Sequence, residues 1–255
     1  MSGLNGKTAL VTGASRGIGR SVAARLAADG ALVAVHYGAN EAAAKETVDA
    51  IEAAGGRAFA FRTELGLPGD AEALWAAFDE RIGEHSDRPG LDILVNNAGI
   101  LVEGSISEVD PEGYDKVFAV NAKAPYFIIK HGLERLRDGG RIINISSGVT
   151  RVAYPPMTAY AASKGALNTL TLTLAQTLGA RGITVNAVTP GIIETDIAPY
   201  LADPETRKAI SAFSVFDRIG QTDDVSGLVA FLASDDSRWV TGQIIDATGG
   251  TGLGL

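Results

Sequence analysis

Hydrophobic and polar positions change along the chain in a regular order. Short aliphatic runs, typical of buried strands, lie at 8–12, 32–36, 57–61, 91–96, 141–146, 183–188 and 243–247. Stretches with helical periodicity separate them, near 17–29, 41–54, 70–84, 112–137, 158–180 and 223–233. Strands that alternate with helices predict an α/β fold, with a parallel sheet covered on both faces. No linker or repeat divides the chain, so we expect one domain over residues 1–255.

One segment has an ambiguous pattern. Residues 169–178, TLTLTLAQTL, alternate like a strand, yet they continue from Tyr160 without a turn signal, and Ala, Leu and Gln favour helix. We therefore predict one long helix that is apolar on nearly all sides. Such a helix is buried on more than one face. The sheet can cover one face, and we expect a second subunit to cover the other, in a homodimer or a homotetramer.

Composition narrows the class of protein. Apolar residues make up 46% of the chain and charged residues 20%, which is typical of a globular protein. The net charge is −8 with scattered basic residues, which argues against a nucleic-acid partner. There is no cysteine, and His36, His85 and His131 lack ligand spacing, so no metal site is expected. Neither a signal peptide nor an apolar run of about 20 residues is visible, so we expect a cytoplasmic protein without a membrane span.

A glycine-rich turn follows the first strand. In TGASRGIG, residues 12–19, glycines stand at 13, 17 and 19. Glycine permits a tight turn and a close approach of backbone N–H groups to a pyrophosphate, and the helix that follows presents its positive end to the anion. The motif therefore predicts a dinucleotide site that includes Gly13, Ser15, Arg16, Gly17, Ile18 and Gly19. A tight strand-to-helix turn without a ligand is the alternative.

The end of the second strand favours NADP over NAD. An NAD site usually carries an acidic residue there that binds the ribose hydroxyls. This chain has HYGAN at 36–40 and no acid before Glu41, which we interpret as a helix-start residue. Arg16 in the glycine loop is placed to meet a 2′-phosphate, although it is alternatively a solvated loop charge. We expect further cofactor contacts from His36, Tyr37, Gly38 and Asn40.

A tyrosine and a lysine share a helical face after the fifth strand. Tyr160 and Lys164 are four residues apart, and Ser147 stands at the carboxyl end of that strand. A nearby ammonium favours the phenolate and so lowers the tyrosine pKa, which allows proton exchange with an alcohol oxygen. The Ser147 hydroxyl is suited to hold that oxygen. A Tyr–Lys pair by itself also occurs by chance on many helices.

These motifs together resemble the single-domain branch of the short-chain dehydrogenase/reductase family over nearly the whole chain. The matching segments are TGASRGIG, NNAG at 96–99, Asn121 in VNAKAPYF, NISS at 144–147, YAASK at 160–164 and PG at 190–191. The resemblance implies a Rossmann-type doubly wound sheet of seven strands. It also implies that Tyr160 is the general acid/base, that Ser147 binds the substrate oxygen, and that Lys164 also bonds the nicotinamide ribose.

The resemblance implies further site residues. Asn121 would hold a water in a proton relay with Lys164. The nicotinamide would be lined by Pro190, Gly191, Ile193 and Thr195, and the adenosine side by Asn97, Ala98 and Gly99. Alternatively, Asn96 and Asn97 mainly tie the fourth strand to its neighbours. The chain departs from the family at Glu64–Leu65, where an Asp and a small apolar residue usually contact the adenine.

The expected reaction is NADP(H)-dependent reduction of a ketone, 3-oxoacyl or another carbonyl, to a secondary alcohol. The alternatives are an NAD(H)-dependent alcohol dehydrogenase, a catalytically silent NADP-binding regulator and a nucleotide-sugar epimerase or dehydratase. Residues 192–216 are interpreted as a substrate lid in which Tyr200, Leu201, Phe213 and Phe216 cover an apolar substrate, or as an ordinary helical hairpin. The lid has only two basic residues, Arg207 and Lys208, which is limited grounds for or against a carrier-protein substrate.

Overall fold

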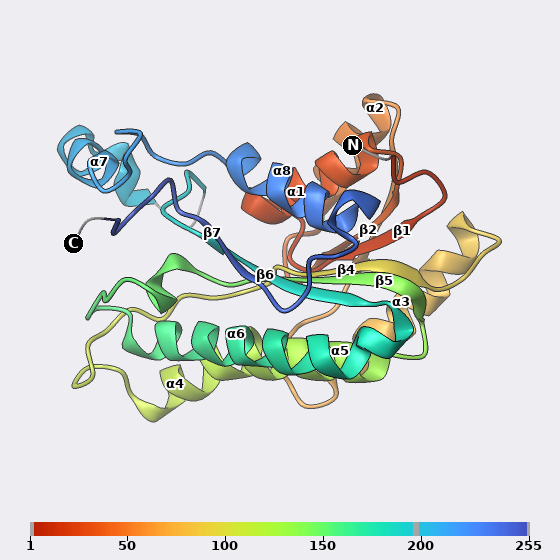
Figure 1. Ribbon diagram of the computed structural model, residues 1–255, viewed down its shortest axis with the longest axis horizontal. Helices are drawn as coiled ribbons and strands as arrows, with labels where there is room; N and C mark the ends of the chain where they lie inside the picture. Colours follow the sequence, from red (N-terminus) through yellow and green to blue (C-terminus); the bar gives the residue numbers. More distant parts are fainter. Residues whose placement is uncertain (1–2, 196–198, 254–255) are drawn as a thin grey trace.

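A parallel sheet of seven strands forms the centre of the molecule (Figure 1), a computed structural model that describes residues 3–195 and 199–253. The strand order is β3-β2-β1-β4-β5-β6-β7, and every paired strand runs parallel to its neighbour. The strands are β1 (Thr8–Val11), β2 (Leu32–Tyr37), β3 (Arg57–Arg62), β4 (Leu91–Asn96), β5 (Leu136–Ile145), β6 (Thr184–Pro190) and β7 (Ile244–Ala247). The predicted α/β class, with a single doubly wound Rossmann-type sheet, is confirmed.

Helices cover both faces of this sheet (Figure 1). One face carries α1 (Gly17–Ala28), α2 (Glu41–Ala53) and α8 (Thr222–Ala233). The other carries α3 (Asp70–His85), α4 (Pro111–Phe118), α5 (Ala124–Gly132) and α6 (Thr158–Leu178). The short α7 (Pro204–Ser211) lies at one end of the molecule, close to the carboxyl terminus.

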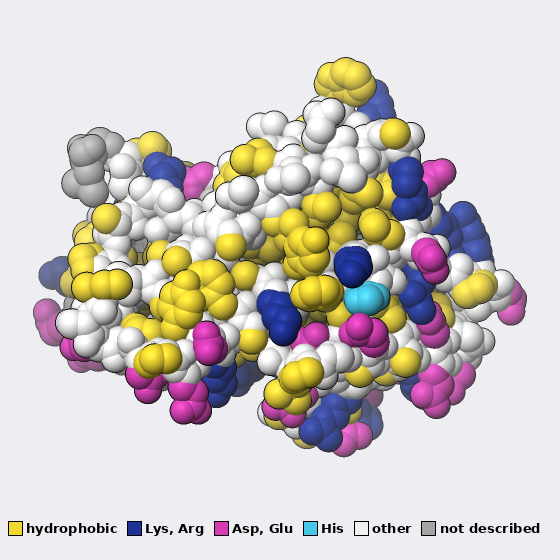
Figure 2. All heavy atoms as spheres, turned by 90° about the horizontal axis from the view of Figure 1, so that it is seen from below, with side chains coloured by type: hydrophobic (Ala, Val, Ile, Leu, Met, Phe, Trp, Pro, Cys, Tyr) yellow, Lys and Arg dark blue, Asp and Glu magenta, His cyan; other side chains and the backbone are white. Residues whose placement is uncertain are grey.

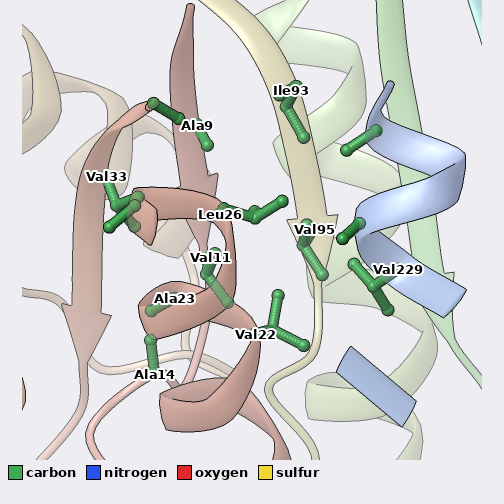
Figure 3. Packing of buried hydrophobic residues seen from close by; sticks show 14 of the residues in the cluster. Ala9, Val11, Ala14, Val22, Ala23, Leu26, Val33, Ile93, Val95 and Val229 are labelled. Carbon is green, nitrogen blue, oxygen red and sulfur yellow. The ribbon is translucent and has the colours of Figure 1, made fainter. Parts of the chain in front are cut away.

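Alternate residues of each strand enter different cores, because successive side chains of a strand point to opposite faces. Ala9 and Val11 pack against α1 and α8, whereas Leu10 packs on the side of α3, α5 and α6. Figure 3 shows the first core, in which Val22 and Leu26 of α1 lie against β1 and β4. The two cores fix the strands from both sides, so the loops at the strand ends have a rigid base.

The order in which the chain adds strands to the sheet reverses once, although all the strands are parallel. The chain moves outward from β1 through β2 to β3, and then returns across β1 to β4 and continues to β7. In open α/β sheets the ligand crevice lies at the carboxyl ends of the strands where the order reverses. Here that position lies between β1 and β4, and it receives the glycine loop after β1 and the NNAG loop after β4.

Most predicted elements are confirmed, including the long helix α6 through the strand-like segment. The predicted helix at 112–137 is wrong in two respects. A wide π-helical turn at Ala119–Lys123 interrupts it, and it ends at Gly132, because Gly132 packs on the Trp75 ring and Leu136 already pairs with Leu91 in β5. The helix α7 was not among the predicted helices.

The described part of the chain lacks two features, a membrane-spanning helix and a cluster of metal ligands. Over residues 3–195 and 199–253, no helix has the length and apolar character needed to cross a bilayer. The same residues contain no group of three or more histidine, aspartate or glutamate side chains arranged to hold a metal ion.

Candidate active site

The loop between β1 and α1 has the backbone that its glycines predict. Gly13 and Gly17 have φ angles of 63° and 55°, in the left-handed region that favours glycine. A Cβ at Gly13 would lie 2.9 Å from Cα of Ala98, and a Cβ at Gly19 would overlap the carbonyl of Gly13. The loop is therefore a cradle that side chains would fill, and it lies at the amino end of α1. These residues fit a bound dinucleotide pyrophosphate.

The NNAG segment braces this cradle from the neighbouring strand. The Thr12 hydroxyl oxygen accepts hydrogen bonds from the backbone N–H groups of Asn97 (2.9 Å) and Ala98 (3.0 Å). The Asn97 amide donates back to the carbonyls of Thr12 (2.8 Å) and Gly13 (3.0 Å). Next to it, the Asn96 amide donates to Asn144 on β5. The side chains of Asn96 and Asn97 thus have the structural role that the sequence left as an alternative.

His36 supports the cradle from behind. Its Nδ1 accepts the Gly13 N–H at 3.1 Å, and its Nε2 lies 2.9 Å from the carbonyl oxygen of Thr63. Because Nδ1 accepts, the ring proton is on Nε2 and is donated to Thr63. Burial lowers the His36 pKa to about 4, so the ring is neutral near pH 7. With 1% of its surface exposed, His36 offers no surface to a ligand, and the predicted direct cofactor contact is wrong.

Arginine side chains lie near the end of β2, where a 2′-phosphate is expected. Arg16 is exposed, and its guanidinium has no hydrogen bond or ion pair with any residue that the structure describes. Arg62 is aligned with Tyr37 across the strand pair, and its Nε donates to the carbonyl of Gly38 at 2.9 Å. The Asn40 side chain accepts the Ala43 N–H and caps α2, as predicted for a helix start. Arg62 was missed, although its place opposite Tyr37 follows from the strand register.

The remaining adenosine-side residues lie as follows. Tyr37 is mostly buried, and burial followed by the charge of Glu41 raises its pKa. Glu64 is exposed after β3, whereas Leu65 packs against the second core. Ile18 packs against the first core from α1. Leu65 and Ile18 therefore shape the crevice through packing, and the exposed Glu64 carboxylate is free to turn toward a ligand.

The catalytic candidates Ser147, Tyr160 and Lys164 come together at the carboxyl end of β5. Ser147 follows this strand, and Tyr160 and Lys164 lie one turn apart on α6. The Ser147 side chain lies beside the Tyr160 phenol, close enough for hydrogen bonding to act on its pKa. Lys164 Nζ lies 5.8 Å from the centre of the Tyr160 ring and donates to the carbonyl of Ile145 at 2.8 Å. The structure thus brings together the three residues that the sequence places thirteen and four positions apart.

Burial dominates the ionisation of this cluster. It raises the pKa of Tyr160, and the hydrogen bond from Ser147 acts in the opposite direction. It also lowers the pKa of Lys164 to about 8. The prediction that Lys164 lowers the tyrosine pKa is therefore wrong for this arrangement, in which the ammonium is directed at a backbone carbonyl. A neutral phenol beside the Ser147 hydroxyl is a proton donor near pH 7.

Asn121 stands in the π-helical turn between α4 and α5. Its Oδ1 accepts the Ile100 N–H at 2.9 Å, and its Nδ2 donates to the Ile100 carbonyl (2.9 Å) and to the Ser163 hydroxyl oxygen (3.1 Å). A Cβ at Gly99 would lie 3.3 Å from both Asn121 Oδ1 and Lys164 Nζ. Gly99, Asn121 and Lys164 therefore meet at one point. The wide turn, which places Asn121 there, was not predicted, and such turns are frequent at functional sites.

The loop after β6 closes the crevice on the other side. Pro190 ends the strand, and the Gly191 N–H donates to the carbonyl of Ala247 at 3.2 Å. Ile193 is buried and forms a bridge with Gly220. The Thr195 methyl carbon lies 3.3 Å from where a Cβ of Gly17 would stand. The predicted nicotinamide-side loop thus reaches across to the glycine loop.

The predicted lid at 192–216 is only partly described, because residues 196–198 lie outside the described residues. Leu201 is buried with Ile219 in a small core of its own, so its predicted contact with substrate is wrong. Tyr200, Phe213 and Phe216 are exposed. Phe213 and Phe216 line a cavity of about 220 Å³ next to the end of β7.

Two further residues hold the glycine loop and were missed in the sequence. Arg20 donates from Nε (3.1 Å) and Nη2 (2.8 Å) to the carbonyl of Ser15, and the Thr47 hydroxyl donates to the same oxygen at 3.2 Å. These three hydrogen bonds fix the direction of the Ser15 carbonyl. Arg20 lies one turn into α1 and resembles any surface arginine in sequence, so no local signal could have identified it.

Comparison with known proteins places the chain in a family. A family model described as enoyl-(acyl carrier protein) reductase matches residues 13–252. The chain belongs to the short-chain dehydrogenase/reductase family. An uncharacterised oxidoreductase of Methylorubrum extorquens is 43% identical over 98% of this chain and 99% of its own length. Some proteins of known structure have a higher sequence identity to this chain.

Two solved structures are each 50% identical to the chain. One is the angucycline C-6 ketoreductase LanV with bound NADP, which covers 100% of this chain and 99% of its own, with a TM-score of 0.95. The other is LugOII, described as a promiscuous reductase that catalyses keto-reduction at C1 during lugdunomycin biosynthesis. The match covers 98% of this chain and 99% of LugOII, with a TM-score of 0.96.

Proposed function

We propose that the protein is an NADPH-dependent ketoreductase that converts a ketone to a secondary alcohol. The observation that carries the proposal is the cluster of Ser147, Tyr160 and Lys164 at the carboxyl end of β5, beside a glycine cradle that fits a dinucleotide. The NADP bound to LanV and the keto-reductions named for LanV and LugOII support it. An oxidoreductase of this family needs both parts in one crevice.

The nicotinamide ring supplies the hydride, and the side chains orient the substrate and move the proton. In the proposed mechanism Ser147 donates a hydrogen bond to the ketone oxygen. Tyr160, neutral because burial raises its pKa, donates its phenolic proton to the same oxygen as the alcohol forms. Lys164 would hold the cofactor ribose and, with Asn121 and a water, would return a proton to Tyr160. The Lys164 pKa of about 8 leaves its ammonium able to exchange protons near neutral pH.

The preference for NADP(H) rests on charge at the end of β2. No acidic residue ends this strand, and Arg16 has no protein partner among the residues described. A guanidinium binds a phosphate through two parallel hydrogen bonds, so Arg16 is suited to the 2′-phosphate. Arg62 places a second positive charge beside Gly38. An NAD(H)-dependent alcohol dehydrogenase would instead be expected to carry a carboxylate at this point.

A large aromatic ketone is the substrate class that we infer. Tyr154, Tyr200, Phe213 and Phe216 are all exposed, and aromatic rings favour contact with a planar polycycle. LanV is named as an angucycline C-6 ketoreductase, and LugOII is named for keto-reduction at C1 during lugdunomycin biosynthesis. Exposed aromatic side chains of this kind are costly for a free surface and suggest a ligand that covers them.

The charges of the lid argue against an acidic carrier protein as substrate. Arg207 is paired with both oxygens of Glu194, at 2.7 and 2.8 Å. Arg218 is paired in the same way with Asp224, at 2.7 and 2.8 Å. These guanidinium charges are neutralised by intramolecular ion pairs at the surface, and the net charge of −8 repels an acidic partner. We therefore favour a free ketone over a 3-oxoacyl carrier thioester.

We propose that the outer face of α4, α5 and α6 forms the interface of a homodimer or homotetramer. A cytoplasmic location remains an expectation from the sequence. Hydrophobic side chains gather on the surface that is seen from below in Figure 2, the side that carries α4, α5 and α6. Tyr114, Tyr126 and Leu172 on these helices are about half exposed. An apolar surface on a helical face is typical of an interface between subunits. The chain offers the same face in each copy, as a twofold dimer requires.

A substrate screen tests the proposal. Purified protein is incubated with NADPH or NADH and with a two-ring aromatic ketone, a four-ring aromatic ketone, a 3-oxoacyl thioester and an enoyl thioester, while absorbance at the reduced nicotinamide band is followed. We expect NADPH oxidation with the ring ketones. Turnover of the enoyl thioester alone would assign the reaction named in the family model, and NADPH binding without turnover of any compound would favour the silent regulator.

A further inference from the structure

The last described residues of the chain lie between two walls of the active site. After β7, residues 248–253 run between the loop that follows Ser147 and the segment 213–216 of the lid. Figure 1 shows this last described stretch, drawn in dark blue, at the same end of the molecule as α7. No predicted role was attached to this glycine-rich tail.

On one side the tail is packed against the catalytic loops. A Cβ at Gly148 would lie 2.8 Å from the methyl carbon of Thr248, and a Cβ at Gly191 would lie 2.8 Å from the Thr248 Cα. Gly148 directly follows Ser147, and Gly191 belongs to the nicotinamide-side loop. Thr248 is therefore wedged between the loops that carry the catalytic serine and the nicotinamide wall.

On the other side the tail holds the lid segment. The Gly249 carbonyl accepts the Val215 N–H at 2.9 Å and the Ser214 hydroxyl at 3.1 Å. A Cβ at Gly250 would lie 2.9 Å from both methyl carbons of Val215. Phe213 and Phe216, on either side of these contacts, line the cavity next to the tail. The position of both aromatic rings thus depends on the position of the tail.

One arginine fixes the tail to the loop after Ser147. Arg151 Nη2 lies 2.6 Å from Asp246 Oδ2 and donates to the Thr251 carbonyl at 2.7 Å. The Asp246 carboxylate also accepts from the hydroxyl groups of Thr189 (3.1 Å) and Thr248 (3.2 Å). A single guanidinium therefore joins the catalytic loop, the end of β7 and the tail, while two threonines keep the carboxylate in place.

We propose that Arg151 is a positioning residue for the ketone: by fixing the tail against Asp246 and Thr251, it holds Phe213 and Phe216 over the substrate. This inference rests on the proposed ketoreductase function, and it concerns affinity for the substrate rather than the chemical step. An isolated exposed ion pair contributes little. Arg151 differs because, besides its ion pair with Asp246, it donates a hydrogen bond to the Thr251 carbonyl. Thr251 lies in the tail, which no helix or strand stabilises.

The test compares Arg151→Met with Arg151→Lys and with the control Arg81→Met. Arg81 forms an ion pair of similar exposure with Glu84 on α3, far from the lid. The first measurement is amide hydrogen exchange at 213–216 and 248–253. We expect Arg151→Met to speed exchange in both segments by about 3- to 10-fold, Arg151→Lys to restore part of the protection, and Arg81→Met to leave both segments unchanged.

The second measurement is steady-state kinetics with NADPH and two ketones. We expect Arg151→Met to raise KM for the four-ring ketone by about 3- to 10-fold, to raise KM for the two-ring ketone less, and to leave kcat and the NADPH dissociation constant unchanged. Unchanged exchange at 213–216, or an unchanged KM despite faster exchange, overturns the proposal. Wild-type protein that reduces no ketone refutes the proposed function instead, and the exchange measurement still decides whether Arg151 holds the tail.

Discussion

The buried imidazole of His36 makes the free energy of unfolding depend on pH between 6.5, its usual pKa, and about 4, its pKa in the folded protein. Its Nδ1 accepts the N–H of Gly13, so the ring must stay neutral for the glycine loop to keep its shape. Protonation places a second N–H against that donor and adds a charge inside the core. The perturbation is a fall in pH from 7 toward 4.5, compared between wild type and His36→Asn. Asparagine keeps an acceptor for Gly13 and does not titrate.

The magnitude follows from linkage. The His36 pKa falls from 6.5 to about 4 on folding, so the unfolded chain binds the proton more tightly than the native protein does. Stability from this group is therefore fully present above pH 6.5 and is lost as the pH falls toward 4. At about 1.4 kcal/mol per pKa unit, the loss between pH 6.5 and 4.5 is about 2 kcal/mol.

The assay is urea unfolding at pH 7.5, 6.5, 5.5 and 4.5, followed by circular dichroism. We expect the free energy of unfolding of wild type to fall by about 2 kcal/mol more than that of His36→Asn between pH 6.5 and 4.5. Both proteins share every titratable side chain other than that of residue 36, so the comparison isolates the contribution of His36. NADPH affinity of wild type should fall over the same range. Parallel pH profiles for the two proteins would refute the assigned tautomer and the depressed pKa.

Three further changes test other parts of the site. Arg16→Ala should weaken NADPH binding by about 10-fold or more and NADH binding little, since only NADPH carries the 2′-phosphate; an equal loss in fluorescence titrations with both would remove Arg16 from cofactor selection. Leu172→Glu should shift the protein toward monomer in sedimentation velocity, and a monomeric wild type would contradict the interface. Gly99→Val should cut kcat about 10²-fold, because the valine methyl groups would crowd Asn121 and Lys164. Circular dichroism should show that the variant keeps the fold. A wild-type kcat in this variant would show that the contact at Gly99 does not matter for the reaction.

Much of the fold could be predicted because local and global signals agree. Each strand is a short aliphatic run with a helix after it, so the parallel order and the crevice after β1 follow from general rules. The segment 169–178 was correctly assigned to a helix, since it continues from Tyr160 without a break. The helix predicted at 112–137 failed because its end is set by contacts with Trp75 and Leu91, which are distant in sequence.

The candidate site shows a similar division. The catalytic trio could be predicted because Tyr160 and Lys164 share a helix and Ser147 ends a strand. The sign of the Tyr160 pKa shift could not, because it depends on burial and on the direction of the Lys164 ammonium. Arg20, which holds Ser15 from α1, has no local signature either. Spacing predicts which residues meet, whereas desolvation and hydrogen-bond direction need the packed structure.

The most direct test of the account is a comparison of wild type with Tyr160→Phe, using NADPH deuterated at the transferred position and a ring ketone. The account predicts that wild type forms an alcohol with deuterium on its carbinol carbon. The variant should bind NADPH with an unchanged dissociation constant and form this alcohol at least about 10²-fold more slowly, since the phenolic proton is gone. Turnover of Tyr160→Phe at the wild-type rate would contradict the central claim that this phenol protonates the ketone oxygen.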